Sequence, residues 1–257
     1  MVIYDLFKKE FRNSIYNVVV GDEKYVGDIA TSSLYRKFLN DIPDGSSILE
    51  IGCGNGICWR RNSSLIKSKS LTIKGIDIDK DYVEFCKEVI EDCELYNCTA
   101  ERSDFLKLHE KSDSSAQTYD YIIFAESYPV IPPSISRKML NACKVHMHTN
   151  SKVVYIHNIV YKENKFLDFI KPKLKHFVSA DFGRTTTMKE FTKFVEDSGE
   201  YEIHSKRELI ALKRINYPKP WQESGFLESI ISDFAGVRKT KANSGQWIFY
   251  LKLKDIE

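Results

Sequence analysis

The sequence predicts an α/β protein in which helices cover both faces of a mostly parallel β-sheet. From Ser46 onward, apolar segments of strand length alternate with helical patterns across short connections. The first strand runs directly into Gly52, Gly54 and Gly56, a turn typical of nucleotide-binding sheets. With 257 residues, 42% of them hydrophobic, the chain can form one large domain and a small accessory element. We therefore expect a helical cap over residues 1–45 and one α/β domain over residues 46–257.

The overall charge speaks against one class of protein, but its distribution along the chain is uneven. Lys and Arg number 38 against 36 Asp and Glu, and the net charge of +2 speaks against a dedicated polyanion binder. The balance conceals a split, because residues 1–133 carry 16 basic and 22 acidic side chains whereas residues 134–257 carry 22 and 14. The basic excess of the second half leaves an anionic acceptor open as a hypothesis.

No targeting, membrane or metal-binding signal is evident in the sequence. The longest apolar stretches have strand length, below the roughly 20 residues that span a bilayer, and charged side chains interrupt residues 1–16. The six cysteines form no C-x-x-C pair, so we expect reduced thiols in a cytoplasmic protein. His146 and His148 would point to different faces of a helix, and we expect no metal there.

The N-terminal cap is predicted from helical spacing. Ile3, Phe7 and Phe11 recur at that spacing, and the β-branched run at 18–20 predicts a short extended piece. A second helix is predicted over residues 28–40, and the turn sequence at 41–45 ends it.

The α/β domain is predicted from apolar runs and helical periodicity. The strands are expected at residues 47–51, 71–78, 97–102, 119–125 and 152–160. Helices are expected at 82–91 and 134–148, with a polar loop at 113–118. The alternation favours parallel pairing of these strands.

The C-terminal part has a different pattern. A helix is predicted at residues 166–174, and the capping-box sequence Thr187-Met188-Lys189-Glu190 predicts another that ends at Gly199. Two long strands are predicted at 202–212 and 246–253. The connection at about 213–245, with a predicted helix at 224–234, is long for neighbouring strands, and we interpret it as an insertion with a functional role.

The segment that ends at Gly56 carries the chemistry. Glycine is required where backbone turns tightly or approaches a ligand closely. Asp77 ends the next strand, where an acidic residue can accept hydrogen bonds from both ribose hydroxyls. A purely structural glycine turn is the alternative, and Asp77 favours the nucleotide site. The dinucleotide pattern G-x-G-x-x-G requires glycine where this chain has Ile57.

With Glu50 before the glycines, the spacing resembles the class I S-adenosylmethionine-dependent methyltransferase family. The matching segments, from roughly Asp28 to the C-terminus, are Glu50–Gly56 (first motif), Gly75–Asp79 (second motif), Ser103-Asp104-Phe105, the strand at 119–124, and the terminal helix and two strands. The resemblance implies a seven-stranded Rossmann-like sheet with an antiparallel last strand. It also implies S-adenosyl-L-methionine as cofactor and S-adenosyl-L-homocysteine as product.

The resemblance assigns cofactor-binding roles. The glycine loop would pass under the methionine and ribose portions, and Glu50 would orient this loop. Asp77 would hold the ribose hydroxyls and Ile78 would pack on adenine. Asp104 would accept from the adenine amino group, with a solvated loop acid as the alternative. The implied residues are Glu50, Gly52, Cys53, Gly54, Gly56, Asp77, Ile78, Asp104 and Phe105, the last through its backbone N–H or an apolar contact.

Candidate residues for methyl transfer are chosen by their place relative to the predicted strands. After the fourth strand the chain reads Ala125-Glu126-Ser127-Tyr128-Pro129 instead of the Asp/Asn-Pro-Pro-aromatic motif, which argues against methylation of DNA adenine or glutamine. An oxygen or ammonium acceptor must lose a proton to a base. The catalytic candidates are Glu126, Tyr128 and His157, and lid residues Tyr16 and Tyr25 are candidate substrate contacts. A core histidine is the alternative for His157, and apolar anchors are the alternative for the two tyrosines.

The main expectation is therefore a methyltransferase that acts on N or O of a small molecule by in-line displacement. A protein or RNA substrate is an alternative, motivated by basic segments at 171–175, 206–214 and 238–241. A non-catalytic S-adenosylmethionine-binding module is another, motivated by the departures after the fourth strand.

Overall fold

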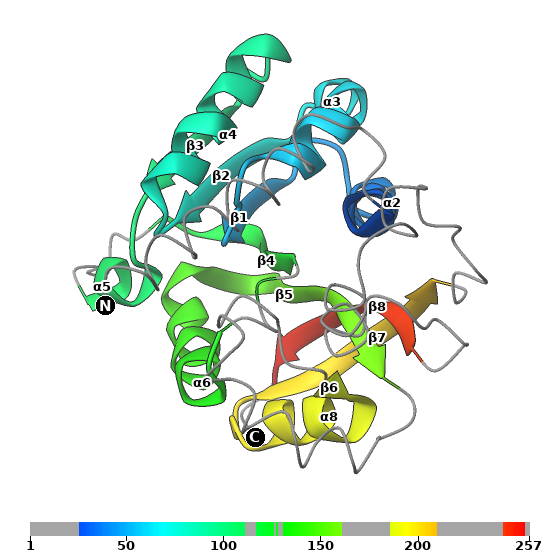
Figure 1. Ribbon diagram of the computed structural model, residues 1–257. Coiled ribbons are helices and arrows are strands. Elements are labelled where there is room, and N and C mark those ends of the chain that lie inside the picture. Colours follow the sequence, from blue (N-terminus) through cyan, green and yellow to red (C-terminus); the bar gives the residue numbers. More distant parts are fainter. Residues whose placement is uncertain are drawn as a thin grey trace, which may run out of the picture.

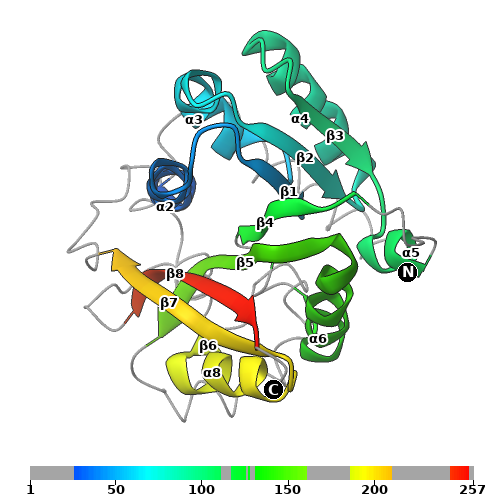
Figure 2. The same cartoon turned by 180° about the vertical axis from the view of Figure 1, so that it is seen from behind.

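The computed structural model describes residues 26–110, 117–125, 127, 131–160, 186–209 and 244–254 (Figure 1). These residues form one twisted sheet with helices on both faces, as Figures 1 and 2 show from opposite sides. None of the helices in this part of the chain combines the length and apolar character needed to span a lipid bilayer. The α/β architecture predicted from the sequence is confirmed.

The sheet is mostly parallel. Its strand order is β3-β2-β1-β4-β5-β8-β7, and the two-residue strand β6 pairs with β5. Strands β1 to β6 pair in parallel, whereas β8 runs antiparallel to both β5 and β7. Seven strands on the main path and an antiparallel last strand confirm the prediction for the described residues. The bounds are β1 Ser47–Ile51, β2 Thr72–Asp77, β3 Cys98–Arg102, β4 Tyr119–Ala125, β5 Met147–Val160, β6 Thr186–Thr187, β7 Tyr201–Leu209 and β8 Ser244–Leu253.

Two apolar cores lie on the two faces of the sheet. One packs α2, α3 and α4 against the sheet, and the other packs α5, α6 and α8. The largest fully buried side chains are aromatic, with Trp59 and Tyr35 in the first core and Tyr155 and Phe191 in the second. The helices are α2 Val26–Asp41, α3 Ile57–Ser68, α4 Lys80–Asp92, α5 Phe105–Glu110, α6 Pro133–Ala142 and α8 Met188–Glu196.

The structure changes one predicted boundary substantially. The helix predicted over 134–148 ends at Ala142, a 3₁₀ turn follows at Cys143–His146, and β5 begins at Met147. The strand starts early because Met147 pairs with Tyr119 of β4, whose carbonyl also accepts from the Ser151 hydroxyl at 2.6 Å. The predicted helices within 1–25, at 166–174 and at 224–234 lie outside the described residues, as do positions 213–243.

The capping box predicted at the start of α8 is confirmed. The Thr187 hydroxyl accepts from the Glu190 N–H at 3.2 Å, and the Glu190 carboxylate accepts from the Thr187 N–H at 2.7 Å. These bonds satisfy backbone donors that a helix start otherwise leaves unpaired. The helix ends at Glu196, and Gly199 follows with φ of +77°.

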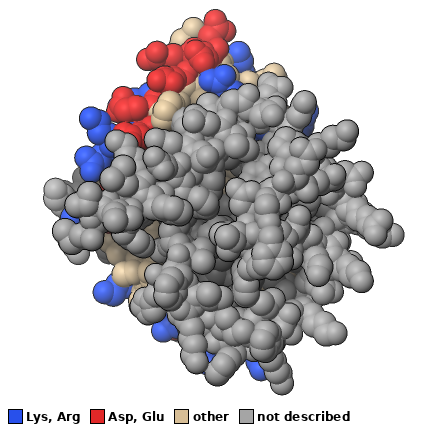
Figure 3. All heavy atoms as spheres, in the orientation of Figure 1, with Lys and Arg blue, Asp and Glu red and all other residues tan. Residues whose placement is uncertain are grey.

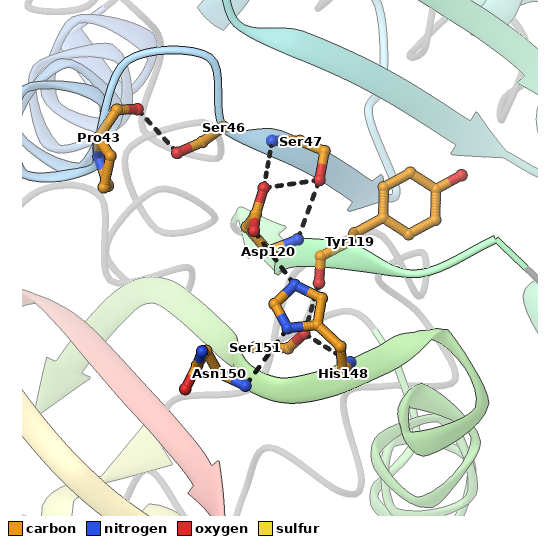
Figure 4. A network of polar contacts seen from close by, with 8 residues as sticks. All are labelled: Pro43, Ser46, Ser47, Tyr119, Asp120, His148, Asn150 and Ser151. Carbon is orange, nitrogen blue, oxygen red and sulfur yellow. Dashed lines mark hydrogen bonds and ion pairs between the residues drawn. The ribbon is translucent and has the colours of Figure 1, made fainter.

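A polar network joins three strands at the amino-terminal edge of the sheet (Figure 4). The Asp120 carboxylate accepts from the Ser47 N–H at 2.7 Å and from its hydroxyl at 2.8 Å. His148 at the start of β5 lies 3.1 Å from the other Asp120 oxygen. This edge is opposite the glycine loop, so the network fixes strand register and lies away from the candidate site.

Acidic side chains gather over α4 at the top of the molecule (Figure 3). The exposed acidic residues of this helix are Asp81, Glu84, Glu88, Glu91 and Asp92. Asp92 pairs with Arg60 at 2.7 Å, and Glu84 pairs with Lys87 at 3.1 Å. Part of the acidic excess of the first half of the chain therefore lies on a solvated helix face.

Candidate functional site

The glycine loop connects β1 to α3 at the carboxyl-terminal edge of the sheet. Gly52, Gly54 and Gly56 have φ of +78°, +57° and +74°, the left-handed region that strains residues with a Cβ. The Gly52 N–H donates to the Ile76 carbonyl at 2.8 Å, which fastens the loop to β2. Gly56 is the N-cap residue of α3, so the loop ends at a helix N-terminus.

The surroundings of the three glycines differ. A Cβ added at Gly52 would lie 2.9 Å from Ser127 Cβ, and one at Gly56 would lie 2.9 Å from Cys86 Sγ. A Cβ at Gly54 would meet no atom of the described residues within 4 Å. Packing within the protein therefore requires the outer two glycines, whereas the described residues leave the space beside the central one open.

The Asp77 carboxylate fastens the loop from the β2 side. One oxygen accepts from the Gly54 N–H at 3.0 Å, and the other accepts from the Asp79 N–H at 2.9 Å. Each carboxylate oxygen can accept more than one hydrogen bond, so two acceptor sites remain for ligand hydroxyls. Asp79 in turn caps α4 and accepts from the Asp81 N–H at 2.9 Å.

Glu50 is buried beneath the loop. It accepts from the Tyr35 hydroxyl at 2.7 Å and from the Trp59 indole N–H at 2.6 Å, both on one carboxylate oxygen. Burial raises the pKa of Glu50 to about 7, the two hydrogen bonds oppose this rise, and the charge of Asp77 adds to it. Glu50 therefore links β1 to α2 and α3. The sequence did not identify these donors; Trp59 follows the loop closely, whereas no local signal marks Tyr35.

The predicted adenine-binding residues lie beside Asp77. Ile78 is 71% exposed, and the Ser103 N–H donates to the Asp77 carbonyl at 2.9 Å, which holds the neighbouring loop against β2. Asp104 is exposed and accepts from the Leu106 N–H at 3.1 Å. The Phe105 side chain is only 2% exposed and packs in the core. Its burial does not suit the expected apolar contact and leaves only its backbone for a ligand.

The predicted catalytic and substrate residues are not brought together by the described structure. Glu126, Tyr128, Tyr16 and Tyr25 lie outside the described residues. His157 has 0% exposure on β5, with its ring centroid 4.9 Å from that of Phe191 and 5.6 Å from that of Phe249. This is the environment of a core histidine, the alternative weighed for it from the sequence.

Ser127 is a neighbour of the loop that the sequence did not identify. It follows the end of β4 by two residues, is 8% exposed, and its Cβ would lie 2.9 Å from a Cβ added at Gly52. A lone serine after a strand carries no pattern of its own, so only the packing of β4 beside β1 reveals it.

Comparisons with known proteins agree with this arrangement. A family model described as a methyltransferase domain matches residues 42–221. No curated protein matches the chain significantly.

Solved structures with the same fold include several methyltransferases. An S-adenosylmethionine-dependent methyltransferase from Geobacter sulfurreducens, in complex with S-adenosyl-L-homocysteine, is 11% identical with a TM-score of 0.60, covering 94% of this chain and 98% of that chain. A geranyl diphosphate methyltransferase is 12% identical with a TM-score of 0.60, covering 88% and 77%.

The mitomycin 7-O-methyltransferase MmcR is 12% identical with a TM-score of 0.57, and the match covers 87% of this chain but 54% of that enzyme. At such identities the solved structures establish a shared fold. Because the family model covers more than half of the 257 residues, the chain belongs to the methyltransferase domain family, with the class I, Rossmann-like fold.

Proposed function

We propose that this protein uses S-adenosyl-L-methionine to methylate N or O of a small-molecule acceptor. The observation that carries the proposal is the hydrogen bond from the Gly54 N–H to Asp77 at 3.0 Å. It joins the glycine loop to the acidic end of β2, so that a nucleoside lying on the loop would meet the carboxylate. This is the crevice in which open α/β sheets bind nucleotides.

The residues present fit this cofactor. Open space adjoins Gly54, Asp77 offers acceptor sites for ribose hydroxyls, and exposed Ile78 offers an apolar surface to a planar base. Asp104 is exposed and follows Ser103, whose N–H donates to the Asp77 carbonyl at 2.9 Å, so its carboxylate is available to the edge of that base. When bound, this cofactor supplies an electrophilic methyl group on a sulfonium. The protein must hold the acceptor in line with that methyl group and exclude water.

The residue that removes a proton from the acceptor is inferred from its place in the sequence after β4. β4 ends at Ala125 at the same edge of the sheet as the glycine loop, Glu126 and Tyr128 come next in the sequence, and we infer that Glu126 is the base. Tyr16 and Tyr25 are proposed to line the acceptor pocket. His157 is not proposed as a base, because a fully buried imidazole cannot contact the acceptor.

Support for a small acceptor comes from the solved structures. Two methyltransferases of the same fold are named for geranyl diphosphate and mitomycin. Of the basic segments that motivate an RNA or protein substrate, the described part contains Lys206 and Arg207. Arg207 forms an ion pair with Asp41 at 2.8 Å, so this cation has a partner within the chain.

Calorimetric titration tests the cofactor. Wild-type protein should bind S-adenosyl-L-homocysteine and not NAD, and Asp77→Asn should weaken the binding at least tenfold because it removes a charged acceptor. Asp81→Asn removes the same charge from an exposed site on α4 and should leave the affinity unchanged. Binding of NAD alone, or equal affinities of both variants, would contradict the assignment.

Turnover tests the acceptor. Transfer of labelled methyl groups to small amines and hydroxyl compounds should exceed transfer to RNA or protein. Transfer to RNA that falls steeply with salt would favour the nucleic-acid alternative. Cofactor binding without transfer to any acceptor class would favour a non-catalytic module. Activity unchanged in Glu126→Gln would remove Glu126 as the base.

A further inference from the structure

Glu50 is a buried carboxyl that no positive charge of the described residues offsets. It is 2% exposed, and its hydrogen bonds come from neutral donors, the Tyr35 hydroxyl at 2.7 Å and the Trp59 indole N–H at 2.6 Å. The described charge that acts on it is that of Asp77, which has the same sign. Buried carboxylates are normally paired with a cation, because leaving water penalises the charge. An unpaired one beneath a ligand site can therefore respond to the charge of the ligand.

Three elements hold this carboxyl in place beneath the glycine loop. Glu50 lies on β1, opposite Gly75 of β2 in the strand register. A Cβ at Gly75 would lie 2.8 Å from the Trp59 ring, so glycine at this position lets the indole of α3 reach Glu50. Tyr35, fully buried on α2, supplies the second donor. Because both donors act on the same carboxyl oxygen, the other oxygen can gain or lose a proton while both bonds persist.

The remaining ionisable groups around Glu50 do not compete for its proton. Burial raises the pKa of Tyr35 well above its ordinary value and that of Cys98 to about 12, whereas the pKa of Glu50 rises to about 7. A hydrogen bond with Cys86 and burial also raise the pKa of Cys53. The described ionisable groups on this face of the sheet are Tyr35 on α2, Cys53 in the loop, Cys58 on α3, Asp77 at the end of β2, Cys86 on α4, Cys98 on β3, Tyr121 on β4 and Tyr250 on β8.

The charge of Asp77 indicates how a ligand on the loop would act on Glu50. Asp77 accepts from the Gly54 N–H at 3.0 Å, so it borders the loop, and its negative charge disfavours ionisation of Glu50. A positive charge bound on the same loop would act in the opposite sense. S-adenosyl-L-methionine carries such a charge on its sulfonium, and S-adenosyl-L-homocysteine does not. Cofactor and product should therefore differ in their effect on Glu50.

We propose that Glu50 releases its proton to solvent when the cationic cofactor binds, and that Tyr35 positions the carboxyl for this ionisation. This assignment rests on the proposed function. By linkage, the cofactor binds more tightly where Glu50 is already ionised, so its affinity rises with pH. Once the methyl group is transferred, the sulfonium charge is gone and Glu50 regains a proton. The buried carboxyl thus favours the exchange of product for fresh cofactor.

Calorimetric titration at pH 6 and pH 7 tests the proposal. The affinity of the wild type for S-adenosyl-L-methionine should rise about threefold over this interval, as for a carboxyl whose ionisation the bound cation favours about tenfold. The affinity for S-adenosyl-L-homocysteine should change by less than about twofold, because the sulfonium charge is missing. Titrations at pH 6 in two buffers that differ in ionisation enthalpy should show proton release when S-adenosyl-L-methionine binds.

Three variants complete the test. Glu50→Gln should abolish both the rise and the proton release, whereas the control Glu88→Gln, at an exposed position on α4, should keep them. Tyr35→Phe removes a donor that favours the ionised carboxyl, so the rise should move to higher pH. Equal weakening of binding by Tyr35→Phe at every pH would overturn the role of Tyr35.

Two results would overturn the Glu50 assignment alone. One is an affinity of the wild type for S-adenosyl-L-methionine that is the same at both pH values, and the other is proton release that persists in Glu50→Gln. Failure of the wild type to bind either ligand would overturn the proposed function and, with it, this assignment.

Discussion

Replacement of Glu50 by glutamine should change how the stability of the protein depends on pH. The carboxyl is 2% exposed, and its pKa rises from 4.5 to about 7 in the folded protein, chiefly through burial. Between these two values the folded protein binds more protons than the unfolded chain. The free energy of unfolding therefore falls as pH rises from 4.5 to 7, and the loss is complete above the folded pKa.

The expected magnitude follows from the shift. One pKa unit corresponds to about 1.4 kcal/mol, so this carboxyl lowers the stability of the wild type by about 3 kcal/mol at pH 8 relative to pH 4.5. Glu50→Gln cannot titrate, and its amide oxygen can still accept from Tyr35 and Trp59. The difference in free energy of unfolding between the variant and the wild type should therefore shift by about 3 kcal/mol in favour of the variant from pH 4.5 to pH 8.

Urea unfolding at pH 4.5 and pH 8 measures the difference. Glu88→Gln, at an exposed position on α4, serves as the control and should change stability equally at both pH values. A Glu50→Gln effect that is the same at both pH values would refute the reasoning, because it would mean that burial does not shift this carboxyl.

Three further substitutions test the packing around the site and the fold. Gly56→Ala should lower the Tm by several degrees, since its Cβ would lie 2.9 Å from Cys86 Sγ at a φ of +74°; an unchanged Tm would argue against that contact. Trp59→Phe removes the indole N–H that donates to Glu50 and should lower the free energy of unfolding by about 1–3 kcal/mol, measured by urea unfolding at pH 8. An unchanged free energy of unfolding would mean that this hydrogen bond does not stabilise the protein. Thr187→Ala should lower the free energy of unfolding by about 1 kcal/mol in thermal unfolding, because it removes the hydroxyl that caps α8. Thr187→Ser keeps that hydroxyl and should be as stable as the wild type. Equal losses in the two variants would exclude the cap as the cause.

Local patterns predicted the sheet well because they depend on near neighbours. The strand at 47–51 was predicted with its observed bounds, and the capping box at Thr187 was identified from four residues. The early start of β5 could not be predicted in this way. His148, Thr149 and Asn150 are polar, and they are extended because Met147 pairs with β4, which lies far away in the chain.

The sequence by itself determined the fold class, the glycine loop and the acidic end of β2, since alternating apolar runs and glycine spacing report burial and turns directly. Only the tertiary structure decided what those groups contact. The bond from Gly54 to Asp77, the two donors to Glu50 and the packing of Ser127 on Gly52 all arise from the order β2-β1-β4 and from helices laid across it. Periodicity shows that a side chain is buried, but the partner that satisfies it comes from a distant segment that the folded sheet places beside it.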